Sequence, residues 1–187
     1  MKLESAQADT PLLLDRARRG DQAAFAALIR MHQASVFSIG YRMLNRRDAA
    51  EDLAQDVFLR IHRGLPYFRG ESKLTTWIYR IVINLLSQRR PALATISLDE
   101  EDDERDRPRM DPGGPDRAFG DMVLRDRLDK AIQQLPVPYQ VLINGHYLKD
   151  MKYEDLVDAL GIPMGTVKTH LHRAKKQLRR ILEAELR

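Results

Sequence analysis

Residues 152–180 read KYEDLVDALGIPMGTVKTHLHRAKKQLRR and predict two short helices joined by a tight turn at Gly161-Ile162-Pro163. Gly161 suits a helix end that requires a left-handed residue, and Pro163 suits the first turn of the next helix. Apolar residues recur at spacings of three and four, so each helix has one buried face. These residues are Tyr153, Leu156, Val157 and Leu160 in the first helix, and Val167, Leu171, Ala174 and Leu178 in the second.

The remaining faces of the second helix are strongly basic. They carry Lys168, Thr169, His172, Arg173, Lys175, Lys176, Arg179 and Arg180. A short helix, a glycine turn and a basic helix are the parts of a helix-turn-helix, which lays its second helix in a major groove. The alternative is a helical hairpin whose basic face is merely solvated. Because the turn residues, both apolar stripes and the charge agree, we favour DNA binding.

Composition limits the class of protein. The chain has 187 residues, of which 43% are hydrophobic and 31% charged, as expected for one globular domain or two small ones. No apolar run is as long as a membrane span, and residues 1–11 lack the apolar core of a signal peptide. The sequence has no cysteine, which excludes disulfides and thiolate metal sites. We therefore expect a cytoplasmic protein.

Charge is distributed unevenly along the chain. Residues 92–120 hold nine acidic residues and four arginines, a net charge of −5, whereas residues 163–187 hold seven basic and two acidic residues, a net charge of +5. Prolines and glycines in the acidic stretch break every helical period, so we predict a flexible acidic linker. It would separate domains at 1–91 and 121–187.

The helical pattern of residues 45–64 carries an acidic face. We expect Asp48 to open a helix whose core-facing residues are Ala49, Leu53, Val57 and Ile61. Asp52 and Asp56 lie four residues apart on another face, with Gln55 and Phe58 nearby. Like charges at that spacing destabilise an isolated helix slightly, so a basic partner would explain them. A solvated acidic face is the alternative.

Residues 64–73 (GLPYFRGESK) mix turn formers with aromatic and basic residues. Tyr67, Phe68, Arg69 and Lys73 suit stacking on unpaired bases while phosphates are held. They equally suit a loop that folds its aromatic side chains into the core.

The next stretch, 73–90, has a clear helical period. Its apolar stripe is Leu74, Trp77, Ile78, Ile81, Val82, Leu85 and Leu86, which predicts core. We expect Thr76, Arg80 and Asn84 to line the opposite side. Asn84 is either solvated or, beside the aromatic-basic loop, a base-reading amide.

Further helical patterns over 122–135 and 138–147 lead into the helix-turn-helix, so the second domain is predicted as a four-helix unit. The fold class expected for the whole chain is all-α, with two small helical domains joined by the acidic linker.

These motifs together resemble a known family. The run Asp52-Leu-Ala-Gln55-Asp56-Val-Phe58, followed by Phe68-Arg-Gly70 and Thr76-Trp77-Ile-Tyr-Arg80-Ile-Val-Ile-Asn84, is similar to region 2 of the extracytoplasmic-function sigma factors of bacterial RNA polymerase. The run Gly161-Ile-Pro163-Met-Gly165-Thr166-Val167-Lys168-Thr169 is similar to their region 4 helix-turn-helix. The resemblance covers almost the whole chain.

The resemblance implies three sets of functional residues. The chain would dock on the β′ coiled coil of core RNA polymerase through Asp52, Gln55, Asp56 and Phe58. The β subunit of core polymerase would also bind the chain. A flipped −10 base would be held by Phe68, Lys73, Arg80 and Asn84, with Trp77 at the same site although its place in the stripe argues first for packing. The −35 element would be contacted by Lys168, Thr169, His172 and Arg173, with Lys175 and Lys176 nearer the phosphates.

The resemblance also implies an alternative sigma factor of the stress-response kind, under an anti-sigma factor, that needs no cofactor or metal and is no enzyme. The chain departs from the family pattern in two places. In the reading helix, His170 stands where arginine is frequent, Thr169 where serine is frequent, and His172 where other residues, including aromatics, occur; these changes put the −35 sequence in doubt but not the role. Pro138-Tyr139-Gln140 stands where an arginine is more usual, and the residues give no account of this departure.

Other classes of protein fit less well. A dimeric helix-turn-helix regulator would leave the acidic docking helix and the aromatic loop without a role. A sigma-like mimic that sequesters an anti-sigma factor usually carries a receiver domain, for which 187 residues leave no room. His170 and His172 point to different helix faces, which makes them poor metal ligands.

Overall fold

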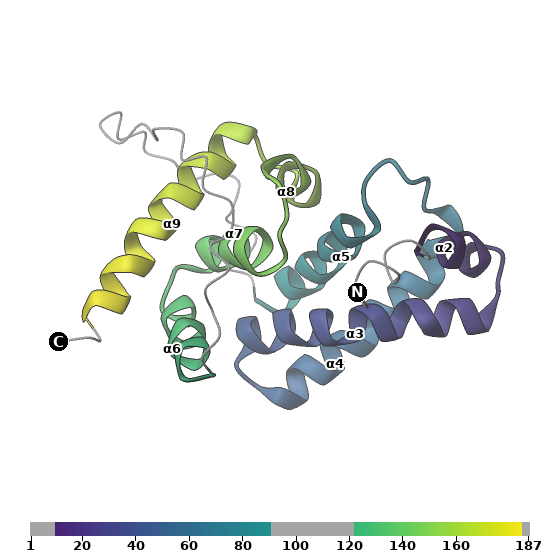
Figure 1. Ribbon diagram of the computed structural model, residues 1–187, viewed down its shortest axis with the longest axis horizontal. Coiled ribbons are helices and arrows are strands. Elements are labelled where there is room, and N and C mark those ends of the chain that lie inside the picture. The colour runs from purple at the N-terminus through teal and green to yellow at the C-terminus, as the bar shows by residue number, and fades with distance from the viewer. Residues whose placement is uncertain (1–9, 91–121, 185–187) are drawn as a thin grey trace. The chain divides into compact units, whose positions relative to one another are not determined.

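The computed structural model describes residues 10–90 and 122–184, and both stretches are helical (Figure 1). The chain divides into two compact units, residues 1–85 and 86–187. The predicted all-α class is confirmed, because no strand occurs among the described residues. The acidic linker predicted at 92–120 lies outside them, and the three-part division of the chain stays a prediction.

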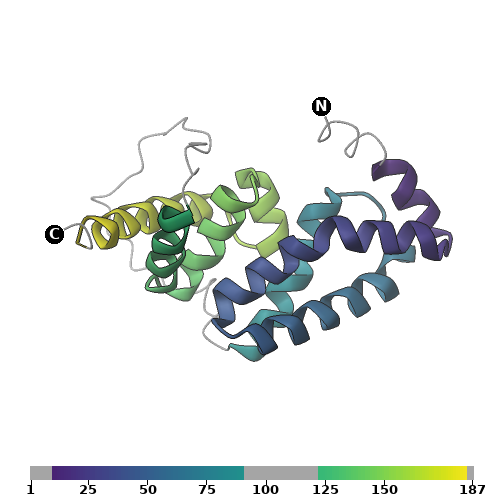
Figure 2. The same ribbon diagram turned by 60° about the horizontal axis from the view of Figure 1, so that its bottom comes forward.

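The first unit contains α2 (Thr10–Arg18), α3 (Gln22–Leu44), α4 (Arg47–Gly64), the 3-10 turn η1 (Leu65–Tyr67) and most of α5 (Leu74–Arg89). Helices α3 and α4 lie side by side in both views (Figures 1 and 2). Gly40 permits this approach, because a Cβ there would lie 3.0 Å from Leu53 Cδ2 and 3.5 Å from Ala50 Cβ. The sequence predicted Ala49 as a core position, and this prediction is wrong by one residue. Ala50 is fully buried against α3, whereas Ala49 is half-buried.

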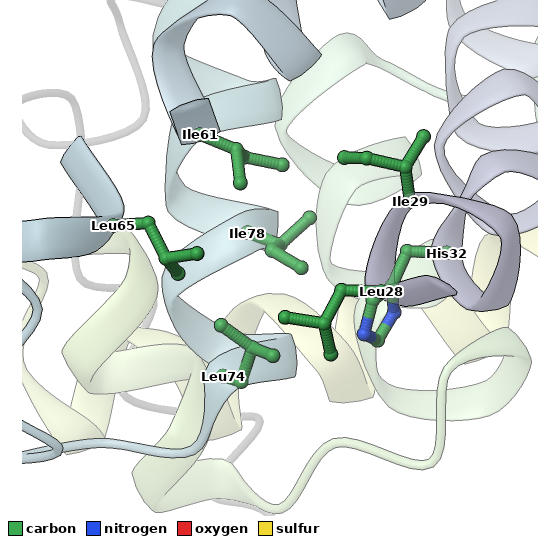
Figure 3. A pocket seen from close by; sticks show the side chains of 7 residues that line it. All are labelled: Leu28, Ile29, His32, Ile61, Leu65, Leu74 and Ile78. Atoms are coloured by element: carbon green, nitrogen blue, oxygen red, sulfur yellow. The ribbon is translucent and has the colours of Figure 1, made fainter. Parts of the chain in front are cut away.

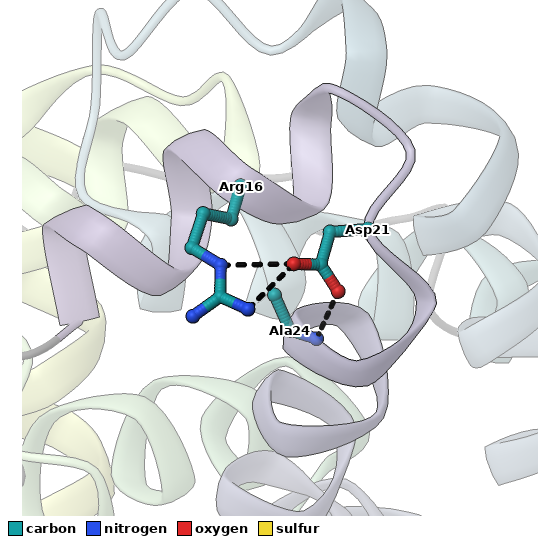
Figure 4. A network of polar contacts seen from close by, with 3 residues as sticks. All are labelled: Arg16, Asp21 and Ala24. Carbon is teal, nitrogen blue, oxygen red and sulfur yellow. Dashed lines mark hydrogen bonds and ion pairs between the residues drawn. The ribbon is translucent and has the colours of Figure 1, made fainter.

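The turn between α2 and α3 is held by one carboxylate (Figure 4). Asp21 Oδ1 accepts a hydrogen bond from the Ala24 N–H at 3.0 Å, which caps the start of α3. Its Oδ2 accepts from Arg16 Nε at 2.8 Å. These bonds, the Ala24 N–H first, lower the pKa of Asp21. The carboxylate therefore stays charged and fixes where the α2–α3 hairpin turns.

A small apolar cavity lies where α3, α4, η1 and α5 converge (Figure 3). It is lined by Leu28, Ile29, His32, Ile61, Leu65, Leu74 and Ile78. Within the described part of the chain, the buried Nε2 of His32 has no hydrogen-bond partner. Burial lowers the pKa of His32, since a charged imidazolium would lose its hydration there. The α3–α5 junction is thus built for a neutral histidine.

The second unit contains α6 (Met122–Gln133), α7 (Val137–Leu148), α8 (Tyr153–Leu160) and α9 (Met164–Ala184). Helices α6, α7 and α8 all contact α9, the longest of the four (Figure 1). Gly161 ends α8 in the left-handed region, with φ +69°, and its N–H donates to Val157 O at 2.8 Å. Pro163 lies just before α9 rather than within its first turn. Its carbonyl accepts from the Val167 N–H at 3.1 Å, which makes Pro163 the N-cap residue.

We expect Gly161→Ala and Gly165→Ala to change the stability of the second unit in opposite directions. A Cβ at Gly161 forces an alanine into the left-handed region, at a cost of about 1–2 kcal/mol. A Cβ at Gly165 enters open space on a regular helix and gains up to about 1 kcal/mol. Urea unfolding followed by far-UV circular dichroism measures both. Equal effects would contradict a left-handed turn at Gly161.

We expect the first unit to lose stability as pH falls from about 7 to 5 through His32. The unfolded chain takes up a proton near pH 6.5, whereas the folded histidine resists protonation until lower pH, so acid favours unfolding. His32→Gln should flatten this part of the pH dependence. Urea unfolding monitored by the fluorescence of Trp77, the chain's single tryptophan, reports on this unit.

The control is His62→Gln on the exposed side of α4. An equal flattening by both substitutions would show that His32 has no special part in the pH dependence.

Candidate nucleic-acid interface

Helix α9 turns its basic residues away from the second unit's core. Val167 and Ala174 are fully buried, and Leu171 is 2% exposed, as the stripe predicted. Lys168, Lys175 and Lys176 are exposed, and so are Arg179 and Arg180 farther along the helix. Thr169, His172 and Arg173 are half-buried. The six predicted −35 residues thus all retain solvent-exposed surface on one helix, while its apolar stripe is inside.

Two rings help to fix the rotation of α9. His170 is buried at 8% exposure, and its ring lies edge-on to Tyr139 of α7, with centroids 5.5 Å apart. His170 is buried and His172 is half-buried, so the two imidazoles lie on different faces of α9, as their spacing predicted. His170 therefore contributes to packing of the helix-turn-helix rather than to contact with a base.

Gln140 explains a departure for which the sequence had no account. Its side chain is buried, and its Nε2 donates to Leu135 O at 2.8 Å and to Gln133 O at 3.1 Å. Gln133 is the last residue of α6, where the helix leaves acceptors unsatisfied, and Leu135 lies in the turn that leads to α7. Asn144, one turn farther on, donates through Nδ2 to Gln140 O at 2.8 Å. Sequence reasoning missed both amides, and the only signal was a polar residue within an apolar run.

The turn between α7 and α8 is ordered by hydrogen bonds and by aromatic rings. His146 Nδ1 lies 2.7 Å from Met151 O, and Asp155 Oδ2 accepts from the Lys152 N–H at 3.0 Å to cap α8. The His146 ring also contacts Tyr147 and Tyr153, with centroids 4.6 and 4.9 Å away. Lys175 Nζ lies 6.0 Å from the centroid of the Tyr147 ring. This distance is at the outer limit of a cation–π interaction, so the contact between α9 and α7 is weak.

In the first unit, the exposed arc of α5 is narrower than expected. Arg80 and Asn84 are exposed one turn apart, Lys73 is exposed just before the helix, and Trp77 is half-buried beside this arc. The expectation that Thr76 shares this side is wrong, because Thr76 is fully buried. More than half of the circumference of α5 is buried, and Tyr79 and Ile83 belong to the buried part. Four of the five predicted −10 residues retain exposed surface.

Phe68, the fifth, belongs to the core. It is 7% exposed, and its ring centroid lies 5.1 Å from that of Trp77. Trp77 packs in turn on Gly64, where a Cβ would lie 3.0 Å from Trp77 Cζ2. The alternative reading of the loop, that it folds an aromatic into the core, therefore holds for Phe68. Its neighbour Tyr67 is 82% exposed and was not among the residues assigned to the −10 site.

The outer face of α4 combines acidic and apolar residues. Asp52 and Gln55 are exposed, and Asp56 and Phe58 are half-buried. Leu59, three residues after Asp56 and four after Gln55, is 55% exposed on the same face. Sequence reasoning missed it because a leucine in a helical period is normally counted as core. The face offers both charge and an apolar contact to a partner.

None of the helices in residues 10–90 and 122–184 combines the length and apolarity needed to cross a membrane.

Comparison with known sequences identifies both units. Residues 28–91 match the Sigma-70 region 2 family, and residues 125–178 match the Sigma-70, region 4 family. The RNA polymerase sigma-H factor of Pseudomonas aeruginosa is 32% identical in an alignment of 186 positions that covers 94% of this chain and 94% of its own. The ECF RNA polymerase sigma factor SigW of Bacillus subtilis is 31% identical over 90% of this chain and 94% of its own.

Solved structures share the fold. CnrH, determined in complex with the cytosolic domain of CnrY, matches with a TM-score of 0.67 at 19% identity, over 95% of this chain and 98% of its own. RpoE of Bartonella quintana, determined with the anti-sigma factor NepR, matches with a TM-score of 0.63 at 21% identity, over 85% of this chain and 96% of its own.

Proposed function

The chain belongs to the extracytoplasmic-function sigma factors of bacterial RNA polymerase, and from this premise we propose how its surfaces divide the work of initiation. It is an alternative sigma factor that binds core RNA polymerase, recognises the −35 and −10 promoter elements and directs transcription initiation under anti-sigma control. Sigma factors regulate transcription, and the polymerase carries out the chemistry.

The −35 element is contacted by α9. Thr169, His172 and Arg173 lie on its outer side and retain enough exposed surface to reach base edges in a major groove. Lys168, Lys175 and Lys176 are more exposed and suit phosphate oxygens, which set affinity and its salt dependence. The buried stripe of α9, with Tyr139 against His170, keeps this side turned outward.

The −10 element is opened and held at α5. Arg80 and Asn84 project from the same exposed arc, and Lys73 lies at its N-terminal end. The asparagine amide can donate to and accept from the edge of an unpaired base, while the two cations hold its backbone. In this proposal Phe68 does not touch DNA. It supports the site by packing on Trp77.

The acidic face of α4 docks on core polymerase. Asp52, Gln55 and Asp56 would meet basic residues of the β′ coiled coil, with Phe58 and Leu59 supplying apolar contact. Charge complementarity of this kind steers association and sets register more than it adds affinity. A further contact with the β subunit is expected for the family.

One observation supports the proposal: two unlike exposed surfaces, each suited to nucleic acid, lie in two separate units of one chain. The second unit offers a basic helix suited to duplex DNA, and the first offers an exposed polar arc beside aromatic residues, suited to a single strand. A dimeric operator-binding regulator needs only the former. A dedicated anti-sigma factor, holding the units so that both surfaces are hidden, would act on the same two sites. Transcription initiation by this sigma factor would take place in the cytoplasm, where the polymerase transcribes.

Reconstituted transcription tests the proposal. Promoters are first located by sequencing RNA from cells that overproduce the protein, and purified chain plus core polymerase should then initiate at those promoters. Failure of the chain to bind core polymerase, under conditions in which another sigma factor binds, would overturn the assignment. Sequence-specific operator binding by the free protein would favour a conventional regulator instead.

We expect Arg173→Ala and Lys176→Ala to weaken promoter binding in different ways. Loss of a base reader costs about 1–3 kcal/mol of discrimination at one position of the −35 element. Loss of a phosphate contact weakens binding to every sequence and lowers the slope of affinity against salt by about one. Binding of holoenzyme to −35 variants at several salt concentrations separates the two. Identical behaviour would refute this division of roles.

Asn84→Ala should impair promoter opening while −35 binding stays intact, because the amide contacts only the unpaired base. The matched control is Gln88→Ala, one turn farther along α5 and also exposed. Permanganate reactivity of the unpaired thymines measures promoter opening. Binding to a duplex that carries only the −35 element measures −35 binding. Equal loss in both assays would contradict the placement of Asn84 at the −10 site.

A further inference from the structure

The cavity that His32 lines connects α5, the helix proposed to hold the −10 element, to the rest of the first unit. Helix α5 contributes Leu74 and Ile78 to the lining, and the ring of His32 lies beside Leu28 of α3 (Figure 3). His32 is the only polar side chain of the lining. A buried water needs about two to four polar partners, so water is not stable in this cavity.

The cavity accepts only the neutral form of His32. Its Nε2 is buried and has no hydrogen-bond partner among the described residues. A neutral imidazole can leave Nε2 unprotonated, at the cost of one hydrogen bond that is not made. An imidazolium carries an N–H on both nitrogens, and the one at Nε2 would be a charged donor facing aliphatic side chains.

No charged neighbour relieves this penalty. The charged or titratable side chains next in sequence to the lining residues are Arg30, Arg60, His62, Lys73 and Tyr79, and none of them lines the cavity. The same holds for Asp15, Arg16 and Arg18 of α2, which packs on α3 and η1. Accordingly, burial alone lowers the pKa of His32. Protonation therefore requires that water reach Nε2.

The start of α5 is the wall of the cavity that can move most easily. Helices α3 and α4 make the most extensive helix–helix contact of the described chain, at the close approach of Gly40. The start of α5, in contrast, follows three consecutive exposed residues, 69–71, of which Gly70 is left-handed with φ +76°. Proteins open locally where buried contacts are few, at free energies well below their global stability.

We propose that His32 is an acid switch for the −10 half of the protein, whose protonation detaches the start of α5 from α3 and so reduces promoter opening. This inference rests on the sigma-factor function proposed above. Lys73, Trp77 and Arg80 belong to the same part of the chain as Leu74 and Ile78, so their positions change when these two residues leave the cavity. The cavity lies entirely in the first unit, and α9 lies in the second, so −35 binding should not respond.

Acid favours the detached state. With α5 detached, water reaches Nε2 and the imidazole titrates near its ordinary pKa of about 6.5. With α5 attached, burial lowers the pKa of His32, so the proton is bound only at lower pH. Because one proton is taken up, the equilibrium shifts toward the detached state by up to about tenfold for each pH unit between the two pKa values. Above about pH 7 the histidine is neutral in both states, and the switch is inactive.

Trp77 reports on this movement in the full chain without polymerase. It is the only tryptophan, and it packs on Phe68 and Gly64 when α5 is attached. We expect its fluorescence to shift to the red as pH falls from about 8 to 5.5 without denaturant, while far-UV circular dichroism changes little. His32→Gln and His32→Met, which cannot be protonated, should abolish the shift. His62→Gln, on the exposed side of α4, is the matched control and should keep it.

Holoenzyme tests the consequence for function. Promoter opening is measured by permanganate reactivity, and −35 binding with a duplex that carries only that element. Wild type and His32→Gln should open the promoter equally at pH 8, whereas wild type should open it about three- to tenfold less than His32→Gln at pH 5.5. Comparison on the same core polymerase removes the pH dependence of the polymerase itself. Binding to the −35 duplex should be the same for both proteins at each pH.

Four outcomes would overturn the inference. They are a pH-independent Trp77 signal in wild type, the wild-type pH response in both His32 variants, an equal acid loss of −35 binding, and loss of circular dichroism in parallel with the Trp77 shift. The last would show that the whole unit unfolds. A wild-type holoenzyme that opens no promoter at pH 8 would instead overturn the proposed function, and the Trp77 titration of the free chain keeps the two failures distinct.

Discussion

Burial of one apolar stripe on α9 is the constraint on which the reading of duplex DNA depends. Successive helical residues are about 100° apart, so the residues that pack inward decide which side chains remain outside. Val167 and Ala174 are fully buried, and His170 joins them against Tyr139. Packing within the second unit therefore sets the orientation of Arg173 and Lys176 before any DNA is present. The proposed recognition surface therefore lies on the side of α9 opposite its buried stripe.

The same constraint acts on α5 with a different result. Periodicity identified Arg80 and Asn84 as exposed but placed Thr76 with them, where it is fully buried. An apolar stripe predicts which residues of a helix are buried. It does not predict how many further residues of that helix the rest of the chain also buries. On α5 the cover reaches Thr76 and Ile83, so the exposed arc is narrow. A narrow arc suits a site for single bases, because few side chains compete for the space.

Local chemistry was predictable, and contacts between distant residues were not. Gly161 could be placed in a left-handed turn because few residues tolerate that conformation, and its φ of +69° agrees. Gln140 could not be understood from sequence, because its partners are carbonyls five and seven residues earlier, at the end of α6 and in the turn that follows it. Tyr67 and Phe68 are adjacent aromatics in a loop without a period. Only the packing of Trp77 on Gly64 and Phe68 decides which of the two is buried.

Two surfaces of low affinity can together bind with high affinity when they belong to one chain. Once α9 is engaged on a duplex, linkage raises the effective concentration of the first unit near the neighbouring DNA. The exposed arc of α5 then needs only enough affinity to hold a strand that polymerase is separating. In the proposed division of roles, α9 relies on phosphate contacts that weaken steeply with salt, whereas the contact of Asn84 with a base edge depends less on charge. The two halves therefore respond differently to ionic conditions, and this difference makes their separate contributions measurable within one holoenzyme.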